Sequence, residues 1–190
     1  MNRRSGRVNL ANKISIARII LIPFFITAIT YSRLDIALVL FILAVISDGV
    51  DGFIARTLNQ KTKLGTILDP MADKLLLISA YIYLSIAGGI PSGLKLPPYV
   101  PIIVISRDAI IVLGSIVVYV IRGDINVSPS VLGKITTFFQ MMTIVSILVK
   151  FDYSYLVWNL TVFLTIASGI DYVIKGSKLL SENHILKKAA

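Results

Sequence analysis

The sequence contains no cysteine and a single histidine, His184, among its 190 residues. The absence of cysteine excludes a disulfide framework and any metal site built from thiolates. With one histidine, which we interpret as a solvated tail residue, neither a zinc site made of several imidazoles nor a Ser-His-Asp triad is expected. Acidic residues are also scarce, because 10 Asp and Glu stand against 19 Lys and Arg, and the formal net charge is +9.

Apolar residues are abundant and fall in long runs. They make up 56% of the chain, whereas a soluble domain usually contains roughly 45–50%, and the mean hydropathy is +0.84. Uninterrupted apolar runs of this kind indicate membrane spans. We therefore predict an all-α integral membrane protein with six transmembrane helices, at about residues 14–31, 36–57, 69–88, 99–121, 131–149 and 154–174.

The basic residues are distributed unevenly between the two ends of these spans. With the N-terminus in the cytoplasm, the predicted outer loops hold only Arg33, Lys95 and Lys150. The inner segments and span ends hold Arg3, Arg4, Arg7, Lys13, Arg56, Lys61, Lys63, Arg122, Lys175, Lys178, Lys187 and Lys188. Positive charge accumulates on the cytoplasmic side of membrane proteins, so we predict a multi-pass protein of the cytoplasmic (inner) membrane with both termini in the cytoplasm.

The same distribution suggests three segments and accounts for the net charge. Residues 1–13 form a basic juxtamembrane segment, residues 14–174 the six-span domain, and residues 175–190 a basic C-terminal tail. The N-terminal segment either lies on anionic headgroups or is a disordered tail. In a membrane protein, a basic net charge is explained by the orientation of the chain in the membrane and by attraction to anionic lipid headgroups. We therefore expect no nucleic-acid partner.

Carboxylates inside the apolar stretches are the feature that most needs an explanation. Asp48, Asp51, Asp69, Asp73 and Asp108 all lie in or at the ends of hydrophobic segments. A charged side chain at the centre of a span costs about 2.5–3.5 kcal/mol on insertion scales, and it usually has a partner and a function.

The spacing of four of these aspartates places them together. Asp48 and Asp51 are three residues apart, and Asp69 and Asp73 are four apart, so each pair shares one face of its helix. Both pairs lie at the cytoplasmic ends of consecutive antiparallel spans. Four carboxylates in a poorly solvated place repel one another, and one or two divalent cations with a preference for oxygen, Mg²⁺, Mn²⁺ or Ca²⁺, would neutralise them. Capping or surface roles would explain two of the four at most.

Small and basic residues accompany the carboxylates. Gly49, Gly52 and Gly65 leave bare backbone that a bulky ligand can approach closely, although for Gly49 taken alone helix packing is the favoured explanation. Arg56 follows Asp48 by about two helical turns and is suitably placed for a phosphate. We therefore predict a polar, metal-containing cavity that opens to the cytoplasm.

The pattern resembles the complete signature of the CDP-alcohol phosphatidyltransferase family, at matching positions Asp48, Asp51, Gly52, Ala55, Arg56, Gly65, Asp69 and Asp73. Further stretches resemble the phosphatidylglycerophosphate synthase branch of that family, at residues 12–18, 59–63, 68–74, 133–137 and Gln140. Two positions depart from the branch pattern, with Ser15 for its usual Thr and Asp108 for its usual Glu. Ser106, Arg107 and Asp108 with residues 133–137 are also similar to the cardiolipin synthases of the same superfamily.

The resemblance implies a reaction and a set of roles. A phosphatidyl group would pass from CDP-diacylglycerol to glycerol 3-phosphate with release of CMP. Two Mg²⁺ or Mn²⁺ ions would be held by the four aspartates, and Asp73 would also be the general base. The CDP-lipid pocket would be formed by Gly52, Arg56, Thr62 and Gly65, and the enzyme would form homodimers.

The acceptor alcohol requires a binding site of its own. Arg107 and Lys134 are cations in apolar stretches and would bind the acceptor phosphate. An ion pair with Asp108 is the alternative for Arg107, and a lysine that extends its amine to the membrane surface is the alternative for Lys134. Phosphatidylglycerol, which would give cardiolipin, and inositol-type alcohols stay open as acceptors.

Two other classes of function were considered. Carboxylates within spans also mark ion paths in cation transporters, but these cluster at one membrane face and the outer halves of the spans offer no matching polar residues. A non-catalytic lipid-binding or assembly protein would need no base, so the complete carboxylate set argues against it.

Overall fold

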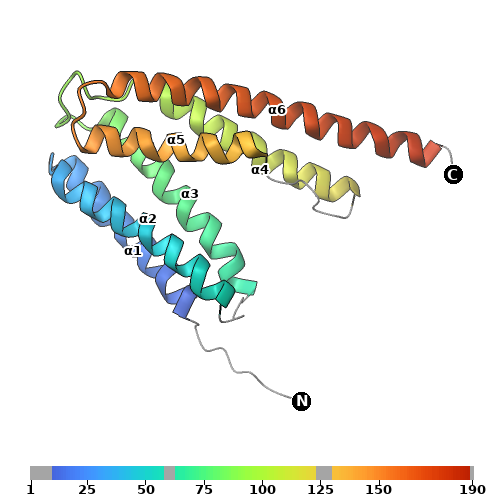
Figure 1. The fold of residues 1–190 in the computed structure, drawn as a ribbon, viewed down its shortest axis with the longest axis horizontal. Helices are drawn as coiled ribbons and strands as arrows, with labels where there is room; N and C mark the ends of the chain where they lie inside the picture. The colour runs from blue at the N-terminus through green and yellow to red at the C-terminus, as the bar shows by residue number, and fades with distance from the viewer. Residues whose placement is uncertain (1–9, 58–62, 123–129, 189–190) are drawn as a thin grey trace, which may run out of the picture. The chain divides into compact units, whose positions relative to one another are not determined.

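The computed structural model describes the backbone of residues 10–57, 63–122 and 130–188, and the side chains of residues 16–47, 71–118, 120 and 130–177. In this part of the chain every regular element is a helix (Figure 1). The helices are α1 (Leu10–Thr30), α2 (Leu34–Thr57), α3 (Lys63–Ile86), α4 (Tyr99–Arg122), α5 (Val131–Leu148) and α6 (Ser154–Lys188). Each overlaps most of one of the six predicted apolar segments, so the all-α prediction is confirmed.

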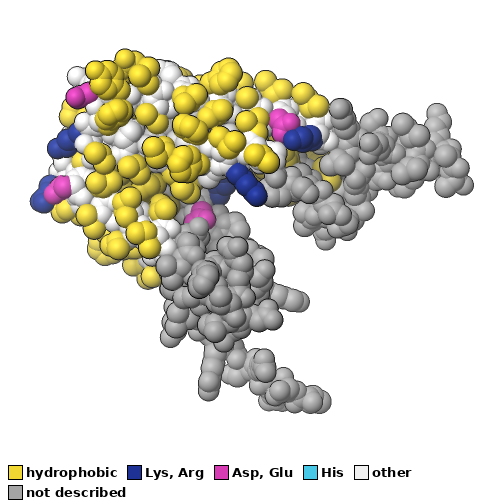
Figure 2. Space-filling model, in the orientation of Figure 1, with side chains coloured by type: hydrophobic (Ala, Val, Ile, Leu, Met, Phe, Trp, Pro, Cys, Tyr) yellow, Lys and Arg dark blue, Asp and Glu magenta, His cyan; other side chains and the backbone are white. Residues whose placement is uncertain are grey.

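Three of these helices are long and apolar enough to cross a membrane over described residues: Tyr99–Val118, Val131–Leu148 and Ser154–Ser177. Two shorter apolar helical stretches, Ile16–Thr30 and Leu34–Ser47, precede them. Large apolar side chains on the outer faces of the helices are exposed, among them Phe24 at 61%, Ile102 at 63% and Phe163 at 68%. Figure 2 shows such side chains spread over the described surface, as expected of a membrane protein whose helices face lipid.

The C-terminal helix extends past the predicted sixth span. We predicted that the span ends near residue 174 and that a basic tail follows, but α6 continues as a helix of 35 residues to Lys188. At 1.5 Å per residue it is roughly 52 Å long, against a hydrocarbon core of about 30 Å. The predicted tail is therefore helical through Lys188. Residues 1–9, most of the predicted N-terminal segment, lie outside the described residues.

The chain divides into two compact units, one of residues 1–95 with 147–150 and one of residues 96–146 with 151–190. In the first unit, α1 packs against both α2 and α3. Its core includes Phe25 of α1 and Phe41 of α2, whose ring centroids are 5.9 Å apart, and Tyr81 and Leu84 of α3, which are fully buried. Buried side chains recur at helical spacing on α1, at Ile22, Phe25 and Ile29, and on α3, at Leu77, Tyr81 and Leu84, which defines the buried face of each of these helices.

Two helix ends are closed by a residue in the left-handed region. Ser32, with φ of 61°, follows α1, and the amide of Arg33 donates to the carbonyl of Ala28 at 2.8 Å. Lys150, with φ of 59°, follows α5, and the amide of Phe151 donates to the carbonyl of Ser146 at 2.9 Å. Both hydrogen-bond patterns are Schellman caps. The left-handed residue of such a cap, here Ser32 or Lys150, is usually glycine.

In the second unit, small and polar side chains join the helices. Thr143 Oγ1 of α5 and Thr161 Oγ1 of α6 lie 2.8 Å apart, and Thr161 also donates to the carbonyl of Phe139 at 3.0 Å. Between α4 and α6, the hydroxyl of Tyr172 lies 2.7 Å from Ser115 Oγ. Hydroxyl groups on small residues are common at contacts between membrane helices, because they allow close packing and satisfy one another.

Candidate active site

The four signature aspartates lie on two helices that are consecutive in the chain. Asp48 and Asp51 are in the last three turns of α2, and Asp69 and Asp73 are in the first three turns of α3. The predicted helical spacing within each pair is therefore present in the backbone. The same helices contain three of the predicted CDP-lipid residues, Gly52 and Arg56 in α2 and Gly65 in α3, and the fourth, Thr62, lies outside the described residues.

Asp73 is the one signature aspartate whose side chain is described. Its Oδ1 lies 2.5 Å from Nη1 of Arg18, a residue of α1. The Arg18 side chain is 1% exposed, whereas that of Asp73 is 33% exposed. The predicted general base is therefore held from the protein interior by a buried guanidinium, and it keeps an accessible side.

The predicted metal ligands are only partly visible. Among the described side chains no group of three or more His, Asp and Glu residues is close enough to hold a metal ion, and the side chains of Asp48, Asp51 and Asp69 lie outside them. The donor set suits Mg²⁺ or Mn²⁺, because all four members are carboxylates, and the exposure of Asp73 leaves that carboxylate accessible to a ligand. The cluster itself stays a prediction.

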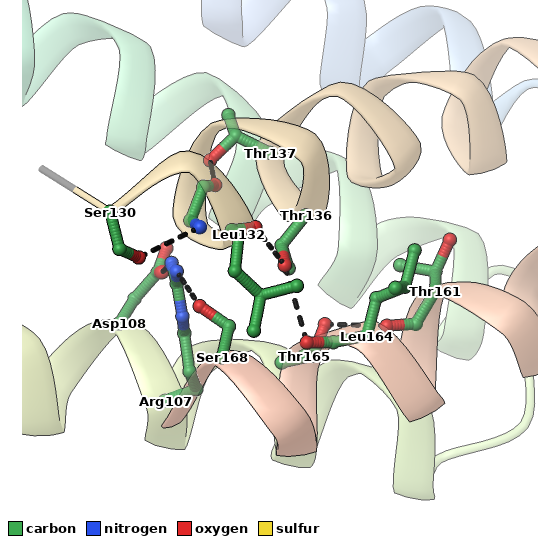
Figure 3. A network of polar contacts seen from close by, with 11 residues as sticks. Arg107, Asp108, Ser130, Leu132, Thr136, Thr137, Thr161, Leu164, Thr165 and Ser168 are labelled. Carbon is green, nitrogen blue, oxygen red and sulfur yellow. Dashed lines mark hydrogen bonds and ion pairs between the residues drawn. The ribbon is translucent and has the colours of Figure 1, made fainter. Parts of the chain in front are cut away.

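The predicted acceptor residue Arg107 lies in α4 and is buried, with 7% of its surface exposed. Its Nη1 donates to Asp108 Oδ1 at 2.9 Å, and its Nη2 donates to Ser168 Oγ of α6 at 2.6 Å. Figure 3 shows the guanidinium between these two side chains. The ion pair with Asp108 that we considered as the alternative role is present, and among the described residues Arg107 Nε has no hydrogen-bond partner.

The start of α5 approaches the same guanidinium. Ser130 caps this helix, because its Oγ accepts from the amide of Gly133 at 3.0 Å. A Cβ atom added to Gly133 would lie 3.2 Å from Nη2 of Arg107 and 3.3 Å from Ser130 Oγ, so glycine is what permits this approach. We call the group Arg107, Asp108, Ser130, Gly133 and Ser168 the arginine junction, where α4, α5 and α6 meet.

Lys134, the second predicted acceptor residue, follows Gly133 in the first turns of α5 and is exposed. No ion pair of Lys134 is found within the described part of the chain. Its amine is therefore accessible, in agreement with either a ligand contact or the extended lysine that we considered as its alternative.

Two contributors were missed when residues were assigned roles from the sequence. Arg18 was part of a branch-like stretch but received no role, although a charge inside an apolar span is itself a signal of function. Ser168 gave no signal, because a serine in a membrane helix is ordinary and its partner Arg107 is 61 residues away in the chain.

Three helices long and apolar enough to cross a membrane, together with the exposed apolar side chains and the ion pairs of the buried Arg18 and Arg107, define the class as a helical membrane protein. Residues 8–167 match the CDP-alcohol phosphatidyltransferase family, and the chain belongs to this family. It is therefore an enzyme of the class that moves phosphatidyl groups, and the family identification made from the signature residues is confirmed.

Several relatives of known name are similar over most of their length. The CDP-diacylglycerol--glycerol-3-phosphate 3-phosphatidyltransferase of Bacillus subtilis is 34% identical, over 93% of this chain and 99% of the relative. The protein of the same name from Aquifex aeolicus is 30% identical, over 91% of this chain and 98% of the relative. A human cardiolipin synthase (CMP-forming) is also 30% identical, over 89% of this chain but 62% of the relative.

Proposed function

We propose that this protein transfers the phosphatidyl group of CDP-diacylglycerol to glycerol 3-phosphate and releases CMP. The observation that carries the choice of acceptor is the similarity to two bacterial relatives named for this reaction, which covers nearly all of both chains. The human cardiolipin synthase is similar over a smaller part of its own length, so phosphatidylglycerol is the second candidate acceptor.

The four aspartates would hold one or two divalent cations, Mg²⁺ or Mn²⁺, in a polar cavity open to the cytoplasm. When bound, these cations would neutralise charge on the pyrophosphate and on the departing CMP. The helical spacing of Asp48 with Asp51 and of Asp69 with Asp73 supports this assignment, because residues three or four apart share one side of a helix. Gly52, Arg56, Thr62 and Gly65 would bind the CDP part of the lipid.

The chain's own residues would carry the transfer. The hydroxyl oxygen of the acceptor attacks the phosphorus on the lipid side of the pyrophosphate, a new P–O bond forms, and the bond to the CMP oxygen breaks. Asp73 accepts the proton that the hydroxyl loses. A carboxylate that is held firmly and is partly exposed suits this role, because a general base must reach the proton at hydrogen-bond distance.

The arginine junction and Lys134 would hold the phosphate of the acceptor. The N-terminus of α5, which is partly positive, lies close to the guanidinium of Arg107. Lys134 follows in the first turns of the same helix, which supports a shared role for these groups. The open Nε of Arg107 supports this assignment, because a phosphate would satisfy a buried donor that has no partner among the described residues.

The test is an assay of the purified protein in detergent or vesicles with radiolabelled CDP-diacylglycerol. Glycerol 3-phosphate, phosphatidylglycerol, inositol phosphate and serine are offered in turn. We expect CMP release and phosphatidylglycerophosphate with the first acceptor only. Cardiolipin as the sole product would identify the second candidate, and cation uptake into vesicles without CMP release would identify a transporter.

The role of Asp73 needs a variant of its own. Asp73→Asn should abolish turnover and leave binding of CDP-diacylglycerol within a few-fold of wild type, because the amide cannot accept the proton but has the same shape. Turnover at the wild-type rate in this variant would remove Asp73 from the mechanism as the base.

We also propose that the six helices span the cytoplasmic membrane with both termini inside and that the protein forms homodimers. Because the chain has no cysteine, single cysteines can be introduced directly at Lys95 and at Lys175. A thiol reagent that cannot cross the membrane should label intact cells at residue 95 but not at residue 175. Chemical cross-linking in native membranes should give a dimer band.

A further inference from the structure

Arg18 is a buried charge in an apolar helix without an acidic residue of its own. The sequence of α1, Leu10–Thr30, contains no Asp or Glu, and the Arg18 side chain is 1% exposed. Arg18, Ile22, Phe25 and Ile29 are spaced by four, three and four residues and are all buried. Arg18 therefore lies on the face that α1 uses to pack against its neighbours.

One partner of this arginine is the carboxylate that we propose as the general base. Arg18 Nη1 and Asp73 Oδ1 are 2.5 Å apart although the residues are 55 positions apart in the sequence. The contact joins α1 to α3, two helices that pack together in the same unit. A charge-assisted hydrogen bond restricts the carboxylate more strongly than a neutral hydrogen bond would.

The two ends of the pair are exposed to very different extents. The arginine is enclosed, whereas the aspartate has 33% of its side-chain surface exposed. Ala72, Leu76 and Leu77 around Asp73 on α3 are buried, so the backbone at this position is fixed by packing. Arg18 is therefore enclosed and fixed, whereas the Asp73 carboxylate is accessible. This arrangement is expected when one residue orients a reactive group on another.

We propose that Arg18 is the positioning residue for Asp73 in phosphatidyl transfer. The guanidinium holds Oδ1 and so fixes the χ1 and χ2 angles of Asp73, which aims the carboxylate toward the acceptor hydroxyl. Arg18 itself touches neither substrate. This inference rests on the proposed function, because it assigns Arg18 to the step in which Asp73 accepts the proton.

The expected kinetic signature follows from this indirect role. Loss of a supporting partner commonly lowers activity about 10- to 100-fold, and we expect Arg18→Met to lower kcat by that amount. The KM values for CDP-diacylglycerol and for the acceptor should stay within about 2-fold, because no ligand contact is lost. Arg18→Lys keeps the charge but not the planar fork, so it should recover part of the lost kcat.

A control must separate positioning from simple loss of stability. Thr161→Val removes a fully buried polar contact between two other helices, α5 and α6, and lies outside the proposed catalytic residues. Unfolding of each variant can be followed by the fluorescence of Trp158, the single tryptophan of the chain. We expect Thr161→Val to keep the wild-type kcat per folded molecule, and Arg18→Met to lose it.

Two results for the variants would overturn the proposal. One is a kcat for Arg18→Met within about 2-fold of wild type, per folded molecule. The other is an Arg18→Lys variant that is no more active than Arg18→Met. An increase in KM at unchanged kcat would also overturn it, because that result means a ligand contact. A wild-type protein that releases no CMP with any acceptor would instead refute the proposed function, and the role of Arg18 with it.

Discussion

The closest steric constraint at the arginine junction is at Gly133, and replacing this residue by alanine tests the geometry there. The added Cβ would lie 3.2 Å from Arg107 Nη2, 3.3 Å from Ser130 Oγ and 3.9 Å from Ser168 Oγ. Arg107 cannot easily move away, because Asp108 and Ser168 hold its two terminal nitrogens at 2.9 and 2.6 Å. The variant must therefore strain the junction or displace the guanidinium.

The magnitude follows from two opposing contributions. Alanine within a helix is favoured over glycine by about 0.8–1.0 kcal/mol, and overpacking a closed site usually costs about 1–3 kcal/mol. Gly176 in α6 supplies the matched control, because a Cβ there would meet nothing within 4 Å. Gly176→Ala should show the helix gain alone, so Gly133→Ala should be less stable than this control by about 1–3 kcal/mol.

The assay compares the melting temperatures of the two variants in the same detergent. For a chain of this length, 1 kcal/mol corresponds to about 2–4 °C, so the difference should fall between roughly 2 and 12 °C. If Arg107 binds the acceptor phosphate, Gly133→Ala should also raise the KM for glycerol 3-phosphate and leave the KM for CDP-diacylglycerol unchanged.

If Gly133→Ala raises the melting temperature as much as Gly176→Ala does, then the junction has room for a methyl group, and Arg107 is not confined as described. A normal acceptor KM in a destabilised Gly133→Ala protein would keep the packing argument and remove the proposed acceptor role of Arg107.

Four further predictions test other parts of the molecule. Gly114→Ala should be destabilising in a thermal melt, because its Cβ would lie 2.8 Å from a ring carbon of Tyr172, and unchanged stability would contradict the packing of α4 against α6. Lys150→Gly should stabilise the protein by about 1 kcal/mol, since φ is 59° there, and a lower melting temperature would argue against the left-handed cap. Lys134→Gln should raise the acceptor KM several-fold at unchanged kcat, and an unaltered KM would leave Lys134 as a surface lysine. Chelation by EDTA should stop CMP release and added Mg²⁺ or Mn²⁺ should restore it, whereas full activity in EDTA would remove the metal from the proposal.

The helices could be predicted from the sequence because apolar runs determine where a chain can span a lipid bilayer. The length of α6 could not be predicted in this way. The apolar run ends near Ile174, whereas the helix continues to Lys188, because lysine, leucine and glutamate favour helix in water as well. The end of a span and the end of a helix are separate physical events, and hydropathy reports only the first.

The site was predictable where its residues are close in the sequence. Asp69 and Asp73 share a helix face by spacing alone, and Arg107 is adjacent to its ion-pair partner Asp108. The contact of Arg18 with Asp73 depends on which face of α1 meets α3, and that of Arg107 with Ser168 depends on how α4 meets α6. No periodicity within one helix specifies these orientations, so both contacts required the three-dimensional structure.

The separation of Arg18 from Asp73 along the chain also affects how this protein is made. Asp73 follows Arg18 by 55 residues, which a ribosome adds in roughly 3–11 s at about 5–20 residues per second. During that time α1 contains an arginine whose carboxylate partner in α3 has not been synthesised, and an unpaired charge is costly to bury. If α1 spans the membrane as we propose, its insertion should therefore become more stable when α3 arrives and Asp73 pairs with Arg18.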